Sequence, residues 1–294
     1  MAAPQHKPVM CDEVIQWISP RPGAVLVDGT TGGGGHTRLL AEAVGPTGLV
    51  IGMDRDQDAL DQAEEGLRGL PIKLAHSNYS DLPELLKQLE LTAVDGIVLD
   101  LGLSSDQLAD GSRGFSFTAD GPLDLRFNQQ EGKPAWQLLE RLNQKQLADL
   151  IYEYGEERYS RRIAQRIVER RRADPIRTAG QLADLVRSCV PRARHAGSID
   201  PATRTFQALR IAVNEELKWL DVALDRLPDC LAPGGRIVII SFHSLEDRRV
   251  KLAFRDDPRL EVLTRKPVQA TDAEVAANPR SRSAKLRAAQ RVDT

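Results

Sequence analysis

The chain has 294 residues, of which 41% are hydrophobic and 28% are charged, and its formal net charge is −2. These values are typical of a globular protein that buries a full core in one large or two smaller domains. The net charge excludes a protein that is strongly basic as a whole, so any binding to nucleic acid has to use local basic patches.

Cysteine usage and hydropathy indicate the compartment. The three cysteines, Cys11, Cys189 and Cys230, are far apart and form no CxxC pair. We therefore expect reduced thiols, with neither a disulfide framework nor a metal site. The N-terminal residues lack the apolar segment of a signal peptide, and no run approaches the ~18 apolar residues of a membrane-spanning helix. We expect a cytoplasmic protein that binds no membrane.

The first predicted element is a short apolar run from Val25, in the sequence VLVDGTTGGGGH. Such a run, ending in glycine, is typical of a buried parallel strand that enters a tight loop. The glycines Gly32–Gly35 let the backbone approach a ligand because they carry no Cβ atom. Residues 37–44 then show helical periodicity. Strand, glycine loop and helix together predict a nucleotide-type cofactor site at the first turn of a doubly wound sheet.

The spacing of the glycines narrows the kind of cofactor. No lysine follows them, which excludes a Walker loop, and His36 and Thr37 stand where a GxGxxG dinucleotide motif would continue. The spacing Asp-x-x-x-Gly-x-Gly, with Asp28, Gly32 and Gly34, instead resembles the first motif of class I methyltransferases, which bind S-adenosylmethionine. A plain turn is the alternative interpretation of such a loop.

Strand and helix patterns then alternate. Apolar runs predict strands at residues 49–53, 72–75 and 94–99, with helices at 56–67 and 82–91. This repetition favours the α/β class, with a mostly parallel, Rossmann-like sheet and helices on both faces.

Two residues after these strands suit an adenosine ligand. Asp54 ends the second strand, about 20 residues beyond the glycines, and is placed to accept hydrogen bonds from both ribose hydroxyls. Its alternative role is to cap the next helix, and the same aspartate would also serve NAD. Tyr79 follows the third strand, where its ring could stack on adenine or belong to the core.

Polar residues also follow the fourth and fifth strands. Asp100 begins the segment DLGLSS, which includes Ser104 and Ser105, and His243 follows the predicted strand at 236–242. Side chains at the carboxyl ends of parallel strands face the ligand crevice. The two serines could instead form a polar turn, and His243 could be a structural histidine. Ser244 and Asp247 could form a capping box for the helix that follows.

The βα alternation is interrupted at about residue 110. Residues 110–205 show no convincing strand, and a long amphipathic helix at 206–227 then leads back to the fifth strand. We predict one α/β domain formed by residues 1–109 and 206–294, with a helical insertion at 110–205. Helical patterns in the insertion lie at residues 134–150, 156–173 and 178–190.

Two stretches of the chain are rich in basic residues. The segment 158–172 carries seven arginines, Arg161, Arg162 and Arg166 among them, with apolar residues at helical spacing. The C-terminal segment adds a second group from Arg280 to Arg291. Charge runs are usually solvated surface, but two arginine-rich stretches in a chain of net charge −2 favour contact with nucleic-acid phosphates.

Several motifs occur in one order along nearly the whole chain. They resemble the bacterial 16S rRNA cytosine-N4 methyltransferase family (RsmH/MraW), and the set is far more specific than any one motif. The motifs are HKPVM (6–10), DGTTGGGGH (28–36), DLGLSSDQL (100–108), RGFSF (113–117), GPLDLRF (121–127), YGEER (154–158), PATRTFQALRIAVNEEL (201–217), FHSLEDR (242–248) and NPRSRSAKLR (278–287).

The resemblance implies a class I methyltransferase domain with a helical insertion. The activity it implies is transfer of a methyl group from S-adenosylmethionine to the N4 amine of a decoding-region cytidine in 16S rRNA of the small ribosomal subunit. The family's cofactor positions fall here on Gly34, Gly35, His36, Asp54, Tyr79, Asp100 and Gln107.

Orientation is the main catalytic requirement of such a reaction, because the N4 lone pair is delocalised into the cytosine ring. Our candidates for accepting the hydrogen of the amine are Asp100, Ser104 and His243, in that order, although Asp100 could belong to the methionine part of the cofactor. The target base has to leave its stack, and an arginine beside aromatic rings could hold it. Candidates for this contact are Arg113, Phe115 and Phe117.

Three other functions compete with this one. An NAD-dependent oxidoreductase is disfavoured by the absent GxGxxG motif. A non-catalytic RNA-binding ribosome assembly factor that retains the cofactor fold is disfavoured by the intact glycine loop and Asp54. A small-molecule methyltransferase would leave both arginine-rich stretches without a function.

Overall fold

The computed structural model describes residues 8–117, 120–191 and 200–292. The chain divides into two compact units: unit 1 comprises residues 1–105 and 217–294, and unit 2 comprises residues 106–216. The insertion expected from the sequence, at 110–205, lies within the bounds of unit 2.

Unit 1 is built on one sheet of eight strands, in the order β3-β2-β1-β4-β5-β8-β6, with β7 also paired to β8. The first five strands run parallel, whereas β8 is antiparallel to β5, β6 and β7. The strands are β1 (Val25–Asp28), β2 (Leu49–Asp54), β3 (Ile72–His76), β4 (Val94–Asp100), β5 (Leu231–Ser241), β6 (Leu260–Val262), β7 (Val268–Gln269) and β8 (Lys285–Arg291).

Helices cover both faces of this sheet because its central strands are apolar on both sides. In β1, Leu26 packs into a cluster with α1 and α2, while the next residue, Val27, faces a second cluster with α4, α11 and α12. Successive strand residues alternate between the two cores in this way, as the pleat requires. The helices of unit 1 are α1 (Cys11–Ile18), α2 (Gly35–Val44), α3 (Gln57–Gly66), α4 (Leu82–Gln88), α11 (Glu216–Arg226), α12 (Ser244–Asp256) and α13 (Asp272–Ala277), with short 3₁₀ turns η1 (Tyr79–Asp81), η3 (Leu227–Cys230) and η4 (Pro279–Ser283).

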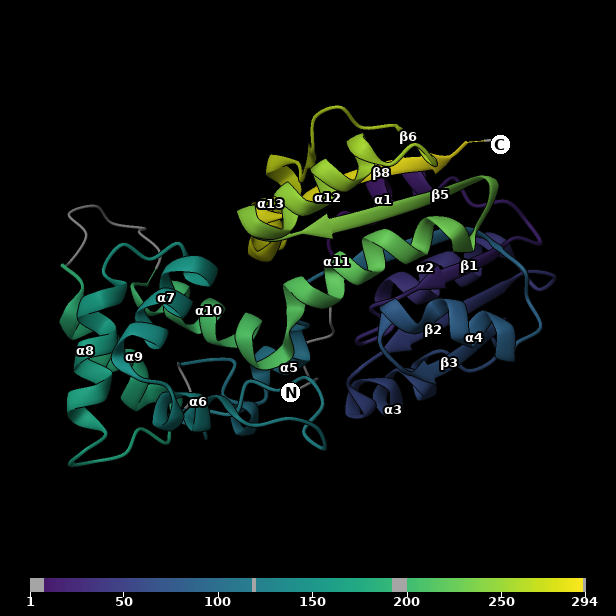
Figure 1. Cartoon of the computed structure of the whole chain (residues 1–294). Coiled ribbons are helices and arrows are strands. Elements are labelled where there is room, and N and C mark those ends of the chain that lie inside the picture. Colours follow the sequence, from purple (N-terminus) through teal and green to yellow (C-terminus); the bar gives the residue numbers. More distant parts are fainter. Residues whose placement is uncertain (1–7, 118–119, 192–199, 293–294) are drawn as a thin grey trace. The chain divides into compact units, whose positions relative to one another are not determined.

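The C-terminal edge of the sheet differs from the sequence prediction. The basic residues after Arg280 lead into β8, which lies beside β5 (Figure 1), and β6 and β7 were not predicted either. Strand β5 begins at Leu231, five residues before the predicted start, because Leu231 already pairs with Val94. Residues 231–235 (LAPGG), whose composition is typical of a turn, form an irregular first part of this strand, with Gly234 at φ +74°.

Unit 2 is helical, and the structure describes only an isolated bridge between Pro122 and Thr178 as β-pairing within its described residues. The predicted helix 134–150 is two helices, since the side chain of Asn143 caps α7. The predicted helix 206–227 is also two helices, because Glu215 adopts a left-handed conformation at φ 51°. The helices are α5 (Ser105–Ala109), α6 (Ala135–Arg141), α7 (Gln144–Gly155), α8 (Ser160–Arg170), α9 (Ala179–Cys189) and α10 (Ala202–Asn214), with the 3₁₀ turn η2 (Gly111–Arg113).

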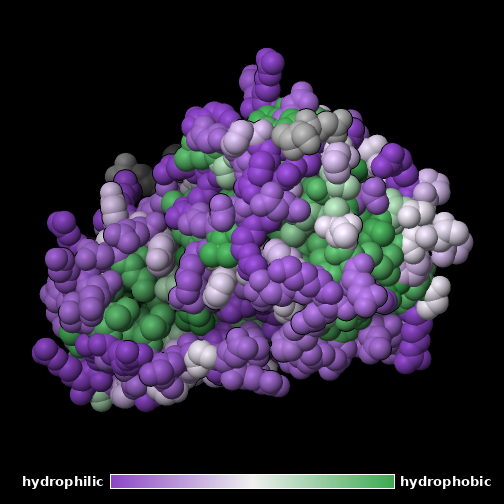
Figure 2. All heavy atoms as spheres, turned by 45° about the vertical axis from the view of Figure 1, so that its right-hand side comes forward, coloured by the Kyte–Doolittle hydropathy of each residue, from purple (hydrophilic) through white to green (hydrophobic). Residues whose placement is uncertain are grey.

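The surface is largely polar. Figure 2 shows hydrophilic side chains over most of one face, with smaller hydrophobic areas between them. Within the described residues, every helix is too short or too polar to span a bilayer.

Candidate functional site

Three aspartates end three adjacent parallel strands of unit 1. Asp28 is the last residue of β1, Asp54 of β2 and Asp100 of β4, and β1 lies between the other two strands. The carboxyl ends of neighbouring parallel strands share one edge of the sheet, so the topology gathers these carboxylates around the glycine loop that follows β1.

Asp28 holds the loop in shape. It is fully buried, its Oδ1 accepts from the Thr30 amide (3.1 Å), and its Oδ2 accepts from Oγ1 of Thr37 (2.6 Å). Burial raises the pKa of Asp28, against the lowering effect of His36 and of the hydrogen bonds from Thr37 and Thr30. Both oxygens are thus engaged within the protein, and Asp28 ties the strand to the loop and to α2.

The glycine loop leads directly into α2. The helix begins at Gly35, two residues earlier than predicted, and Gly34 precedes it in a left-handed conformation at φ 80° without a capping side chain. Amides at such a helix N-terminus are donors without intrahelical partners. The Gly32 amide donates to Oδ2 of Asp54 (2.7 Å), which joins the loop to the end of β2.

A fifth glycine, Gly29, was not singled out by the sequence analysis. A Cβ atom there would lie 2.4 Å from Cδ2 of Leu99 and 2.8 Å from Cβ of Tyr79. Only glycine therefore lets β1 turn into the loop beside the aromatic residue predicted to contact adenine. Its position between the strand and the glycine run was the available signal.

Asp54 lies within the loop network and does not cap α3. The residue at the cap position is Asp56, and the Asp56 amide donates to Oδ1 of Asp54 (2.9 Å). Burial raises the pKa of Asp54 to about 6, although the hydrogen bonds from Asp56 and Gly32 act in the opposite direction. A carboxylate offers about four lone-pair positions, so Asp54 retains acceptor capacity for a ligand.

His36 and Asp100 form a buried pair. Nε2 of His36 is 3.4 Å from Oδ2 of Asp100, and His36 is 4% exposed. Burial disfavours the charged imidazole, but the hydrogen bond and charge of Asp100 outweigh it and raise the pKa of His36. The Asp100 amide donates to Oγ1 of Thr30 (2.7 Å), which fixes the strand end against the loop.

Several buried polar atoms around this pair have no hydrogen-bond partner in the described part of the chain. They are Oδ1 of Asp100, Nδ1 of His36 and Oγ1 of Thr31. Buried polar groups are normally satisfied, so their grouping beside the glycine loop marks a place for a polar ligand.

The remaining predicted cofactor residues lie in both units. Tyr79 begins η1 after β3 and is partly buried against the core of unit 1, and the side chain of Asn78 accepts from the Ser80 amide at this turn. Gln107 lies in α5 of unit 2 and is buried.

The loop after Asp100 is held from the C-terminal part of unit 1. Gly102 turns at φ +111° against the ring of Phe242, and Nη2 of Arg280 donates to the carbonyl oxygen of Leu103. Ser104 is partly buried and lies near the backbone of Gly32. The NPRSRSAKLR motif thereby gains a role that its sequence did not reveal, because Arg280 braces the DLGLSS loop.

His243 is the N-cap of α12. Its Nδ1 accepts from the Glu246 amide (3.4 Å), and its Nε2 lies 3.1 Å from Oε1 of Glu246. The capping box is thus formed by His243 and Glu246, and the box predicted for Ser244 and Asp247 is wrong. Asp247 instead binds Nε of Arg287 (2.7 Å). Nδ1 is thus engaged by the helix, whereas Nε2 is buried without a hydrogen-bond partner in the described residues, and the role of His243 in proton transfer stays a prediction.

Two of the three residues predicted to hold the target base lie inside unit 2. Arg113 and Phe115 are 4% and 5% exposed. The Arg113 guanidinium donates to the carbonyl oxygens of Arg126 (3.0 Å) and Phe127 (2.8 Å). The Arg113 guanidinium thus satisfies buried backbone acceptors, which disfavours a contact with RNA, and the contact of Arg113 and Phe115 with the target base stays a prediction. Phe117 is only partly buried.

The predicted basic helix is α8, and its two faces are segregated. Ile163, Ala164 and Ile167 are fully buried, so one face belongs to the core of unit 2. The other face exposes basic side chains, and one of these, Arg166, pairs with Glu169 (3.1 Å). The exposed arginines predicted to contact RNA are Arg161, Arg162 and Arg166.

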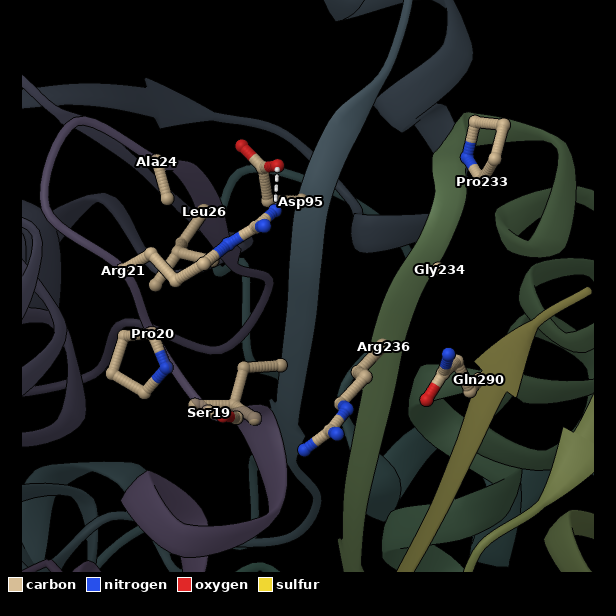
Figure 3. A pocket seen from close by; sticks show the side chains of 11 residues that line it. Ser19, Pro20, Arg21, Ala24, Leu26, Asp95, Pro233, Gly234, Arg236 and Gln290 are labelled. Carbon is tan, nitrogen blue, oxygen red and sulfur yellow. Dashed lines mark hydrogen bonds and ion pairs between the residues drawn. The ribbon is translucent and has the colours of Figure 1, made fainter. Parts of the chain in front are cut away.

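A cavity also occurs at the opposite end of the sheet, where β1, β4 and β5 begin. It has a volume of about 230 Å³, and its walls include Arg21, Arg236 and Gln290 (Figure 3). Arg21 is paired there with Asp95 at 3.3 Å. None of the predicted site residues lines this cavity.

Comparisons with known proteins agree over almost the full length. The model of the MraW methylase family matches residues 3–292. A protein of Rhodopirellula baltica named ribosomal RNA small subunit methyltransferase H is 52% identical, covering 99% of this chain and 93% of its own. One of the same name from Geobacter sulfurreducens is 49% identical, covering 98% and 99%. The solved structure of PH0851 aligns at a TM-score of 0.51 and 13% identity, over 98% of this chain and 46% of its own, which shows a shared fold.

Proposed function

This chain belongs to the MraW methylase family, and on that premise we propose that it is an S-adenosylmethionine-dependent methyltransferase acting on 16S rRNA of the small ribosomal subunit. Within that RNA we propose the N4 amine of a decoding-region cytidine as the acceptor and the cytoplasm as the location. The observation that supports this most directly is the group of three aspartates at the strand ends beside the glycine loop. One of their oxygens, Oδ1 of Asp100, has no hydrogen-bond partner in the described residues.

The residues present fit S-adenosylmethionine. We assign the ribose hydroxyls to Asp54, whose carboxylate is already oriented by the Gly32 and Asp56 amides. Tyr79 provides an aromatic face for adenine. Helix α2 begins at Gly35 without a capping side chain, and its first amides suit the carboxylate of the methionine part. The Gly34 amide donates to the carbonyl oxygen of Thr31 (2.7 Å), so Gly34 shapes the turn before the helix. His36 and Asp100 complete the set within unit 1, while Asp28 and Gly32 shape the loop.

The bound cofactor supplies an electrophilic methyl group on a sulfonium centre. The residues of this chain would have to hold the N4 amine of cytosine in line with that methyl group and accept the proton that the nitrogen gives up on methylation. Fixing both reactants in line can contribute ~7–11 kcal/mol. A hydrogen-bond acceptor that pulls one N4 hydrogen out of the plane of the ring also reduces the delocalisation of the nitrogen lone pair into the cytosine ring.

Asp100 is the first candidate for that acceptor. Its Oδ1 has no hydrogen-bond partner in the described residues, and its Oδ2 lies 3.4 Å from Nε2 of His36, which orients the carboxylate. Ser104, in the same loop, is the second candidate. For His243 we propose a positioning role, since its ring is held by Glu246 at the start of α12.

RNA contacts in this proposal come from exposed arginines. Arg161, Arg162 and Arg166 on α8 present a basic face suited to phosphates. Phe117 is the remaining aromatic candidate for the flipped base, with the guanidinium of Arg187 5.4 Å from its ring.

The proposal is tested by methyl transfer from labelled S-adenosylmethionine to small subunits that lack the modification, followed by mapping of the modified nucleotide. We expect one N4-methylated cytidine with the wild-type chain. The Asp100→Ala variant should retain its fold and lose at least 100-fold in turnover, because it lacks the acceptor. Near-normal turnover of D100A at saturating donor would refute the role of Asp100. Cofactor binding without transfer to any small-subunit RNA by the wild-type chain would favour a non-catalytic assembly factor.

A further inference from the structure

A second cavity in unit 1 is lined by cationic side chains. It has a volume of about 220 Å³ and lies between α12, the edge strand β6 and the loop that follows β6. Its basic residues are Lys251, Arg255, Arg265 and Arg287, and its apolar residues include Phe254 and Val262. We call this cavity the basic pocket. None of the residues assigned above to the cofactor or the acceptor base lines it.

The four basic side chains of the pocket differ in whether an aspartate pairs with them. Arg287 is 5% exposed and bonded to Asp247 at 2.7 Å, and Arg255 binds Asp256. Lys251 and Arg265 are exposed at the rim. No carboxylate lines the basic pocket itself, so its rim keeps a positive charge.

Other cavities of unit 1 have a different charge. The cavity beside α11 and the outer face of α12 is larger, about 590 Å³, but aspartates including Asp221, Asp225 and Asp256 line it. The cavity of Figure 3 contains Asp95 beside Arg21. In a chain of net charge −2, a pocket whose charged lining residues are all basic favours an anionic ligand.

We propose that the basic pocket binds a phosphate-bearing nucleotide of the substrate RNA strand, outside the acceptor crevice. The phosphate lies between Lys251 and Arg265, and the sugar or base covers the apolar wall formed by Val262 and the edge of Phe254. This inference rests on the proposed function, since it names a second contact for the same RNA.

The position of the pocket on α12 supports an RNA strand as its occupant. The helix starts at Ser244, directly after the carboxyl end of β5, and Lys251 lies seven residues further along it. At 1.5 Å per residue the two positions are about 10 Å apart along the helix axis. A single strand leaving the acceptor crevice can follow this helix to the pocket. Recognition of single-stranded RNA beside a target base commonly combines phosphate contacts with an apolar surface.

The test uses the full chain and equilibrium binding of a small-subunit RNA fragment that contains the acceptor cytidine. In the Lys251→Ala/Arg265→Ala variant we expect at least tenfold weaker binding. The slope of log affinity against log salt should fall by about 1 to 2, because up to two phosphate contacts are lost. The affinity for S-adenosylhomocysteine should not change. Lys251→Arg/Arg265→Lys, which keeps both charges, should restore RNA binding.

The matched control removes two exposed cations at the opposite edge of the same sheet, in the Arg68→Ala/Lys73→Ala variant. We expect it to bind RNA as the wild type does. Equal RNA affinity and salt slope for the basic-pocket variant and the wild type would overturn the proposal. Binding of free cytidine monophosphate that depends on Lys251 and Arg265, with RNA binding unaffected, would overturn it in favour of a free nucleotide. Because RNA binding is measured without turnover, a chain that binds RNA but transfers no methyl group contradicts the proposed function only.

Discussion

At the scale of single residues, we expect Asp54 to make cofactor binding depend on pH. Its carboxyl group has a pKa of about 6 because it is buried at the end of β2. Accepting hydrogen bonds from both ribose hydroxyls requires the ionised form, so binding of the cofactor has to deprotonate Asp54 below that pH.

We predict that the affinity for S-adenosylhomocysteine is constant above pH 7 and falls about tenfold by pH 5, since one pH unit below a pKa leaves about a tenth of the group ionised. The Asp54→Asn variant should bind more weakly at every pH and lose this step. Calorimetric titration between pH 5 and 8 measures this step, and an unchanged step near pH 6 in D54N would refute the assignment.

His243 is predicted to act through the start of α12. Its side chain caps the Glu246 amide, and asparagine is an equally good capping residue. His243→Asn should therefore keep the stability of the wild type and turn over within a few-fold of it, whereas His243→Ala should lose about 1 kcal/mol of unfolding free energy in urea. A folded H243N enzyme with turnover reduced 100-fold would show instead that the imidazole exchanges a proton with the substrate.

At the scale of elements, the turn from β1 into the glycine loop has no room for a side chain at Gly29. A Cβ atom on Gly29 would overlap Leu99 and Tyr79, so Gly29→Ala should lose ~1–3 kcal/mol of stability by overpacking. It should also weaken binding of S-adenosylhomocysteine, because Tyr79 has to move. Thermal unfolding and calorimetry test the two effects.

Gly66 is the control for this substitution. It is the last residue of α3, and the nearest atom to its added Cβ would be Nη2 of Arg38 at 3.8 Å. Gly66→Ala should be neutral or stabilising by up to ~1 kcal/mol, since alanine has less conformational freedom to lose. Equal losses in G29A and G66A would contradict the argument from close approach.

The number and the ends of the helices and strands could be predicted only in part from the sequence. The strands up to β4 were predicted within one residue of their observed ends, because buried parallel strands are continuous apolar runs. The strands β6, β7 and β8 were missed because they are short or rich in basic residues; β8 pairs with β5, and β6 and β7 pair with β8. The breaks at Asn143 and Glu215 interrupt patterns whose apolar periodicity continues across them.

At the scale of the whole molecule, a net charge of −2 coexists with concentrated arginine. The exposed face of α8 belongs to unit 2, whereas Asp54 and Asp100 belong to unit 1. RNA affinity and cofactor affinity should therefore respond to different substitutions.

We predict that Arg161→Glu/Arg162→Glu weakens RNA binding at least tenfold and lowers its salt slope by about 2, as expected when two phosphate contacts are lost. The affinity for S-adenosylhomocysteine should be unchanged. Salt-dependent binding of a small-subunit RNA fragment is the measurement, with Arg68→Ala/Lys73→Ala as the control. A salt slope equal to that of the wild type would exclude α8 from the RNA contact.

The sequence by itself determined the α/β class, the strand ends at Asp28, Asp54 and Asp100, and the glycine loop, because these follow from local periodicity and from residues without a Cβ atom. Only the tertiary structure decided the environment of each side chain. The fold buries Arg113, whose guanidinium donates to the carbonyl oxygens of Arg126 and Phe127. It also places the ring of His243 against the side chain of Glu246. The physical reason is that burial and hydrogen-bond partners depend on residues brought together by the fold, which a pattern along the chain does not contain.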